Sequence, residues 1–146
     1  MGYLLKEVSM ALRTAMEDVL RPLGMTVTHY SCLELLAQRP GMTNSDLARE
    51  AFVTRQSMNV LLQALQRDGL VSRPTHASSG RARPAQLTPP GRTQLATATA
   101  AVRAIEIQML AELTERDREL CFRALRQMAS SPAPSVPGGV TAGLDA

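Results

Sequence analysis

The sequence is poor in aromatic residues and has no long apolar run. Of its 146 residues 45% are hydrophobic, but only 3% are aromatic. Leucine, alanine and methionine supply most of the apolar side chains, which favours helices over strands. A membrane span needs about eighteen consecutive apolar residues, and no such stretch is present. The first residues also lack a charged segment that leads into an apolar core, so we expect a cytoplasmic protein without a secretory signal.

Residues that carry catalysis or bind metals are scarce as well. The chain has two cysteines and two histidines, too few for a disulfide scaffold or a typical metal cluster. His29 and Cys32 are three residues apart on one expected helix, but no second matching pair follows, so we expect no metal site. There is no glycine-rich phosphate loop and no cysteine–histidine or paired-carboxylate motif. We therefore expect no enzymatic activity and no cofactor.

The run from residue 54 to residue 71 is the most informative stretch that is present. Thr54 is a candidate N-cap, and Gly69 lies where a helix ends in the left-handed conformation. Four apolar residues between them recur three or four positions apart and therefore share one face: Met58, Leu61, Leu62 and Leu65. The pattern predicts one helix that is buried on one side and polar on the other.

A short helix and a turn precede this helix. Thr43 reads as its N-cap, and Asp46 at the third position completes a shorter version of the capping box. The three residues Ala51-Phe52-Val53 then predict a turn, whose two larger apolar side chains we expect to fill the junction between the helices. This arrangement is typical of a helix-turn-helix in which the second helix reads DNA.

Two extended runs follow the reading helix directly. Residues 70–74 and 84–87 flank Ser78-Ser79-Gly80 and predict a β-hairpin. A helix-turn-helix followed by such a hairpin is a winged helix, at residues 28–88. The expected fold class is therefore mainly α with a small β-hairpin wing, that is, α+β.

Long amphipathic helices flank the winged part. Residues 3–23 and 89–129 carry apolar residues at helical spacing. Threonines are the expected helix caps: Thr28 for the second helix, Thr88 for the long helix and Thr114 for the last one. These stripes are too broad for one small domain to cover, so we expect a homodimer. Residues 1–129 thus form one unit, and residues 130–146 lack periodicity and are expected to be a disordered tail.

The positive charge is concentrated on the reading helix and the wing. Residues 54–83 hold five arginines against the single acid Asp68, whereas the segments before and after are close to neutral. This is the charge distribution of a surface that meets phosphates, although a merely solvated charged face is the alternative.

Candidate DNA contacts fall into three groups. The first turns of the reading helix supply base-reading side chains: Arg55, Gln56, Ser57 and Asn59. Helix N-termini suit phosphate oxygens, and they hold Thr43, Asn44 and Thr54. The wing adds Arg81 and Arg83, with Arg73 at its base.

The order of these elements resembles the MarR family of dimeric winged-helix transcription regulators over about residues 3–129. The resemblance is carried by five segments: residues 43–48, 53–58, 69–73, Gly80-Arg81 and 87–91. It implies a homodimer on a pseudo-palindromic double-stranded DNA operator, and a repressor that a small aromatic or phenolic ligand releases. Two positions depart from the family. The family commonly has an aspartate two residues before the wing arginine, where this chain has Ser79. It also often has an arginine late in the first turns of the reading helix, where this chain has Asn59-Val60.

The resemblance also suggests a ligand site between the dimerisation helices and the winged domain. Arg21, His29 and Tyr30 lie near that junction, where Tyr30 supplies a ring and Arg21 a partner for a carboxylate. Alternatively, Tyr30 is core and Arg21 caps a helix end.

Two other functions stay open at this stage. A redox-sensing regulator of the same fold would use Cys32 or Cys121, although we expect structural roles for both. A winged-helix protein-interaction module is the other alternative, and the arginine excess argues against it.

Overall fold

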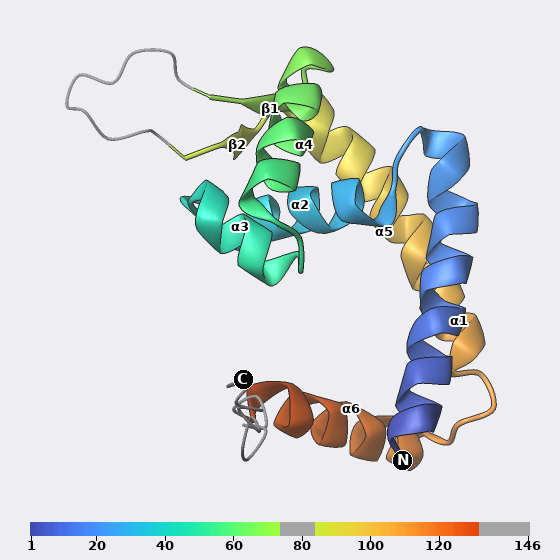
Figure 1. Ribbon diagram of the computed structural model, residues 1–146. Coiled ribbons are helices and arrows are strands. Elements are labelled where there is room, and N and C mark those ends of the chain that lie inside the picture. The colour runs from blue at the N-terminus through green and yellow to red at the C-terminus, as the bar shows by residue number, and fades with distance from the viewer. Residues whose placement is uncertain (74–83, 132–146) are drawn as a thin grey trace, which may run out of the picture. The chain divides into compact units, whose positions relative to one another are not determined.

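The computed structural model describes residues 1–73 and 84–131 (Figure 1). These residues fall into two compact units, with the division between Met109 and Leu110. The elements of the first unit are α1 (Gly2–Leu20), the 3₁₀ turn η1 (Arg21–Leu23), α2 (Val27–Gln38), α3 (Asn44–Glu50), α4 (Arg55–Arg67), β1 (Val71–Ser72), β2 (Gln86–Leu87) and α5 (Pro89–Met109). The second unit holds α6 (Glu115–Ser130). Within the described ranges, no helix combines the length and the apolar character that crossing a membrane requires.

Helices α2, α3 and α4 pack together beside the small sheet (Figure 1). Their inner faces form the core, to which α2 contributes Cys32 and Leu33, α3 contributes Leu47, and α4 contributes the four residues of the predicted stripe. The amphipathic reading helix is therefore confirmed, and Gly69 has the left-handed φ of 71° that was expected at its end.

The base of the wing is the predicted antiparallel hairpin. Val71 pairs with Leu87 and Ser72 pairs with Gln86, and the first pair is buried while the second is exposed. Thr88 then begins α5 as expected, because its Oγ1 accepts a hydrogen bond from the Gly91 amide at 3.1 Å and donates one to the Gly69 carbonyl at 2.6 Å. The turn Ser78-Ser79-Gly80 of the predicted hairpin lies outside the described residues.

The start of α2 differs from the prediction. The cap is Thr26 and not Thr28, because the hydroxyl of Thr26 accepts a hydrogen bond from the His29 amide at 3.2 Å. His29 Nδ1 in turn accepts one from the Thr26 amide, also at 3.2 Å. This reciprocal pair satisfies two amides at the helix start that Thr28 cannot reach.

The turn between α3 and α4 also corrects one expectation. Ala51 and Val53 pack against the core, but Phe52 is 95% exposed and does not fill the junction. Phe52 has a φ of 56°, in the left-handed region, whereas the Val53 amide returns to the Ala48 carbonyl at 2.9 Å. The turn therefore holds Phe52 away from the core on a strained backbone.

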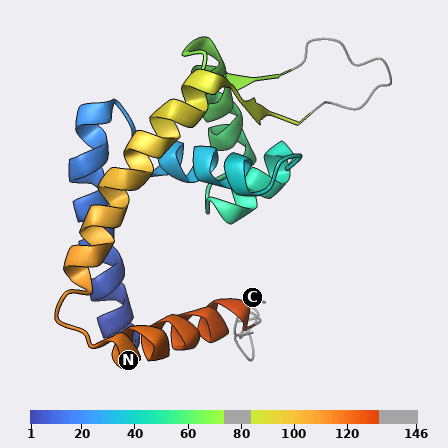
Figure 2. The same cartoon turned by 180° about the vertical axis from the view of Figure 1, so that it is seen from behind.

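Helices α1 and α5 pack along each other in the first unit (Figure 2). Leu20 of α1 and four α5 residues, Leu95, Ala98, Val102 and Ile105, are buried in this part. Gly91 at the start of α5 has no room for a side chain, because a Cβ there would overlap the Leu70 carbonyl oxygen. In contrast, the first half of α1 leaves Leu4, Val8 and Met10 exposed.

Helix α6 begins at Thr114 as predicted, because the Thr114 hydroxyl accepts a hydrogen bond from the Asp117 amide at 3.3 Å. No residue of this helix is buried, and Leu120, Phe122 and Leu125 are each exposed. Cys121 is exposed too, so a single chain does not show the structural role that we expected for it.

Candidate nucleic-acid interface and ligand groove

Helix α4 is fixed at its start by hydroxyl hydrogen bonds. Thr54 Oγ1 accepts from the Ser57 amide at 3.0 Å and donates to Ser57 Oγ at 2.8 Å. Thr54 therefore caps the helix as predicted, and Ser57 is held in the cap as its partner. Both side chains are exposed, so their oxygens remain accessible from outside while they orient the helix.

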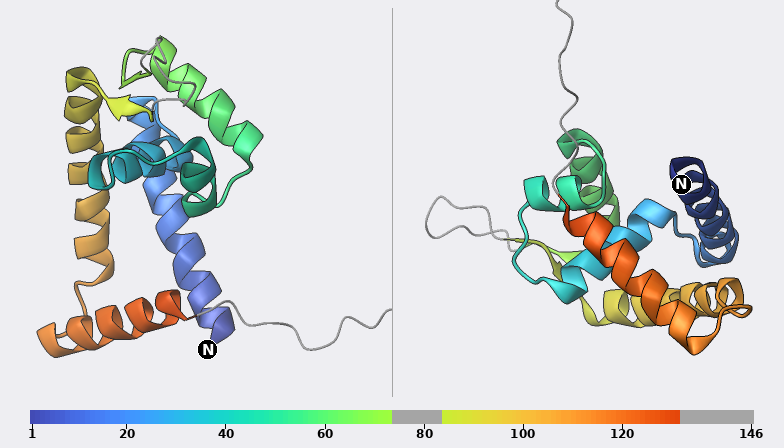
Figure 3. Two further views of the ribbon diagram at one scale, coloured as in Figure 1. Left: turned by 90° about the vertical axis from the view of Figure 1, so that its left-hand side faces the viewer. Right: turned by 90° about the horizontal axis from the view of Figure 1, so that it is seen from below.

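Helix α4 lies at the edge of the winged part (Figure 3, left). The side chains opposite its buried stripe, on its outer face, are exposed. At 3.6 residues per turn, the centre of this face consists of Gln56, Val60, Gln63 and Arg67, all of which are exposed. Arg55 and Asn59 lie at its edge. The sequence motifs point to the first turns only, whereas the outer face also includes Val60, Gln63 and Arg67, as the phase of the buried stripe indicates.

Asn44 joins the starts of α3 and α4. Its Nδ2 donates to the backbone carbonyl of Arg55 at 3.3 Å, while its Oδ1 is buried and has no hydrogen-bond partner among the described residues. Asn44 was selected as a phosphate contact, and the structure also gives it a positioning role, because this bond ties the reading helix to α3.

Thr43 and Asp46 form the predicted capping box at the start of α3. Thr43 Oγ1 donates to the Asp46 carboxylate at 2.7 Å, and Arg49 donates to the same carboxylate at 2.7 Å. The hydrogen bond from Thr43 is the main reason why the pKa of Asp46 is below its usual value. The Thr43 hydroxyl is thus engaged with a carboxylate, and a phosphate would have to compete for it.

Several predicted residues meet around one hollow of about 630 Å³ between α3, α4 and the base of the wing. Thr43 and Asn44 line it from α3, Asn59 lines it from α4, and Arg73 lines it from the end of β1. The structure therefore brings three of the predicted groups together on the side where the wing begins. Arg81 and Arg83 lie outside the described residues.

The three residues suggested for a ligand do not share one cavity. Arg21 is exposed, pairs with Asp18 at 3.3 Å and lines a hollow of about 410 Å³. His29 lines a different hollow, of about 210 Å³, together with Asp68, and burial lowers its pKa while Asp68 opposes that shift. Tyr30 lines neither of these two hollows.

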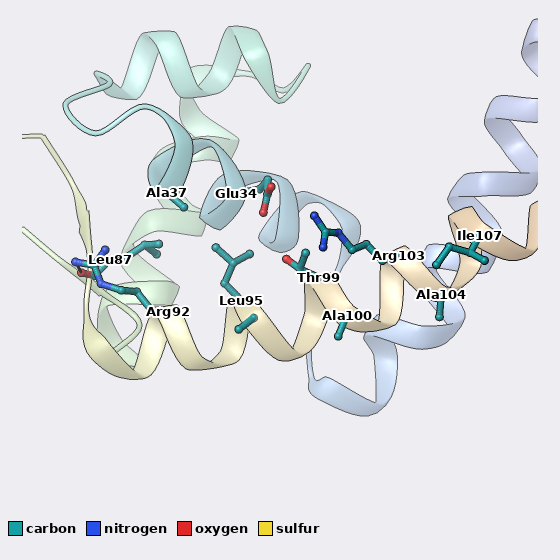
Figure 4. Close-up of a pocket in the computed structure, with 11 residues that line it drawn as sticks. Glu34, Ala37, Leu87, Arg92, Leu95, Thr99, Ala100, Arg103, Ala104 and Ile107 are labelled. Atoms are coloured by element: carbon teal, nitrogen blue, oxygen red, sulfur yellow. Dashed lines mark hydrogen bonds between the residues drawn. The ribbon is translucent and has the colours of Figure 1, made fainter. Parts of the chain in front are cut away.

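A larger groove of about 660 Å³ runs between α2 and α5 (Figure 4). Its walls are mainly aliphatic, from Leu87, Leu95 and Ile107 and the alanines between them, and the polar groups Glu34, Arg92, Thr99 and Arg103 interrupt them. The Tyr30 hydroxyl lies 3.5 Å from Thr99 Oγ1, and burial raises the Tyr30 pKa. This groove is not evident from the sequence, because the pairing of α2 with α5 is a long-range contact.

Cys32 is a buried core residue, as expected. Its Sγ donates to the Met58 sulfur at 3.8 Å, and burial raises the pKa of the thiol to about 12. A buried thiol with so high a pKa stays protonated and is a poor nucleophile, which argues against Cys32 as a redox sensor.

Comparison with known proteins agrees with this geometry. The sequence profile of the MarR family matches residues 23–82. The HTH-type transcriptional repressor Rv2887 of Mycobacterium tuberculosis is 42% identical over 130 residues, which cover 89% of this chain and 94% of the repressor. Its crystal structure with salicylic acid has a TM-score of 0.75 at 42% identity and covers 88% of this chain and 95% of that one. The structure of Rv2887 with DNA has a TM-score of 0.77 at 39% identity, with 89% and 98% covered. This chain therefore belongs to the MarR family of winged helix-turn-helix transcriptional regulators.

Proposed function

We propose that this protein is a transcriptional repressor that binds a pseudo-palindromic operator as a homodimer and is released by a small aromatic acid. The observation that carries the proposal is the open outer face of α4, which a capped start and a buried stripe hold in one orientation. The relationship to a DNA-binding repressor with 42% identity over nearly its whole length supports it.

The outer face of α4 supplies the base contacts. Gln56 and Gln63 can pair with adenine edges, and Arg55 and Arg67 can reach guanine or phosphate. Asn59 and Arg73 border the hollow beside this face. Arg81 and Arg83 stay sequence-based candidates for backbone or minor-groove contacts.

The exposed apolar residues support a dimer. Leu4, Leu5 and Val8 on α1, and separately Leu120 and Leu125 on α6, are apolar side chains that this chain alone leaves in water. Burying them against a second copy removes that apolar surface from solvent. A two-fold dimer then presents two copies of α4, which is why the operator should be pseudo-palindromic.

The ligand site we favour is the groove between α2 and α5. Its aliphatic walls suit an aromatic ring, and Arg92 or Arg103 can hold a carboxylate. The Tyr30 hydroxyl lies next to Thr99, which lines this groove, whereas Arg21 and His29 line other hollows. The salicylic acid complex of Rv2887 supports this ligand class.

A ligand in this groove contacts both the winged part, through α2, and the long helix α5. If the ligand binds more tightly at one angle between the winged part and α5 than at another, it shifts the population toward that angle. Release from the operator follows when the favoured angle spaces the two α4 helices wrongly for successive major grooves.

The test is a fluorescence anisotropy titration of a labelled operator with salicylate, with salicylamide as the uncharged control. Salicylate should weaken operator binding, and salicylamide should not. Arg103→Ala should need about tenfold to 150-fold more salicylate, because a charge-assisted hydrogen bond contributes about 1.5–3 kcal/mol. Arg13→Ala, on α1 outside the groove, is the matched control. If Arg103→Ala responds to salicylate like wild type, this groove is not the ligand site. If the wild-type protein shows no preference for an operator, the proposed repressor function is wrong.

A further inference from the structure

Val60 occupies the middle of the outer face of α4 and is 59% exposed. Its neighbours along this face, one turn away on either side, are Gln56 and Gln63, which are polar and exposed. A β-branched residue is a poorer helix former than alanine, and at this position it buries little apolar surface in exchange. Neither helix propensity nor packing within the described chain explains a valine here.

We propose that Val60 packs against the 5-methyl group of a thymine in each operator half-site and thereby selects a T·A pair there. The assignment rests on the proposed function, in which the outer face of α4 enters the major groove. The helix fixes the direction in which Val60 points, because the opposite side of α4 is buried through Met58, Leu61, Leu62 and Leu65.

The chemistry of the major groove leads to thymine. Thymine is the base that presents a methyl group there, and aliphatic side chains make apolar contact with it. Val60 has no side-chain donor or acceptor, so opposite the amino group of cytosine it would cover a polar group without replacing its hydrogen bond to water. The same side chain therefore attracts thymine and disfavours cytosine at this position.

A protein-binding role for Val60 fits the surroundings less well. Docking sites for proteins are contiguous apolar patches of several hundred Å². Val60 is instead bordered along its own face by Gln56, Gln63 and Arg67, which are hydrogen-bonding and charged groups suited to base edges and phosphates.

The experiment replaces one thymine at a time by deoxyuridine, in both half-sites, in an operator obtained by selection from random DNA. This change removes the methyl group and leaves the hydrogen-bonding edge intact. We expect one position at which uracil weakens wild-type binding about fourfold per half-site, the effect of exposing about one methyl group. For Val60→Ala, the same replacement should change binding less than about 1.5-fold.

Two further variants complete the design. Gln63→Ala removes a proposed base contact on the same face and should lower the affinity for the operator. The ratio of thymine to uracil affinity at the Val60 position should nevertheless stay as in wild type. Val60→Thr keeps the branched shape and one methyl group, and it should retain part of the effect. Alanine is a better helix former than valine, so Val60→Ala should fold at least as well as wild type, which thermal unfolding checks.

The outcomes separate the assignment from the proposed function. An equal uracil effect in wild type and Val60→Ala at every thymine, with operator selection intact, would overturn the role of Val60 and leave the repressor standing. A selection that enriches no operator would overturn the repressor and this assignment together.

Discussion

Asn44 and Arg55, the first residues of two consecutive helices, are joined by a hydrogen bond. Asn44 Nδ2 donates to the Arg55 backbone carbonyl at 3.3 Å, so the start of the reading helix is tied to the start of α3. In a helix-turn-helix, these are the ends that meet the DNA. A side chain that looks like a phosphate ligand in the sequence therefore also sets the position of its neighbours.

Replacing Asn44 by alanine removes this tie. We expect the free energy of unfolding to fall by about 1 kcal/mol, the net contribution of one such hydrogen bond, in urea denaturation. Operator affinity should fall more than affinity for random DNA, because base contacts need the exact placement of α4. Ser45→Ala, next along α3, is the control. If Asn44→Ala and Ser45→Ala behave alike in both assays, the bond does not position the helix.

Phe52 carries a backbone strain that a substitution should relieve. A residue with a Cβ in the left-handed region costs about 1–2 kcal/mol, and asparagine adopts it more readily. Because the ring is exposed, its removal should lose little packing. Phe52→Asn should therefore raise the free energy of unfolding by about 1 kcal/mol. Phe52→Ala removes the ring without adding a side chain that favours the left-handed region, and it serves as the control. An equal gain for alanine would show that the positive φ is not the cause.

His29 should make stability depend on pH. Burial lowers its pKa below the ordinary value of 6.5, so the unfolded chain binds the proton more tightly than the folded one. The contribution of neutral His29 to the free energy of unfolding is therefore complete above pH 6.5. It is lost as the pH falls from that value through the lower pKa of the folded protein. Protonation also removes Nδ1 as the acceptor for the Thr26 amide.

The matched variant is His29→Gln, because glutamine at this position can return the same capping hydrogen bond and does not titrate. The difference in unfolding free energy between wild type and His29→Gln should be constant from neutral pH upward and should shift against wild type in acid. A difference that does not change with pH would show that His29 does not titrate on unfolding.

The exposed apolar stripe of α6 predicts a further sensitivity. Leu120→Glu places a charge among residues that we assign to the dimer interface, so it should yield monomers or unfolded protein in sedimentation experiments. Arg126→Glu introduces the same group on the polar side of this helix and should leave the dimer intact. A folded wild-type monomer at micromolar concentration would contradict the interface altogether.

Local signals in the sequence were sufficient for most of the elements. Thr43, Thr54 and Thr114 cap helices as expected, because a cap depends on atoms within three residues. The start of α2 was placed two residues late, because the partner of Thr26 is a histidine and the usual capping-box pattern has glutamate or glutamine there.

Two further features were not evident from the sequence, for different reasons. Phe52 is apolar, which predicted burial, but the left-handed backbone at this residue turns the side chain outward. The groove between α2 and α5 depends on how two helices far apart in the sequence pack, and the spacing of residues along each helix does not reveal it. Arg21 and His29, which the sequence places near the junction of the flanking helices and the winged part, line other hollows.

The most direct test of the repressor is to select the DNA that the purified protein retains from a random duplex pool and to sequence it. We predict one enriched pseudo-palindrome, with half-sites centred about one helical turn apart, because a two-fold dimer places its α4 helices in successive major grooves. Retained DNA with no enriched sequence, or with a single half-site and no symmetric partner, would contradict the account.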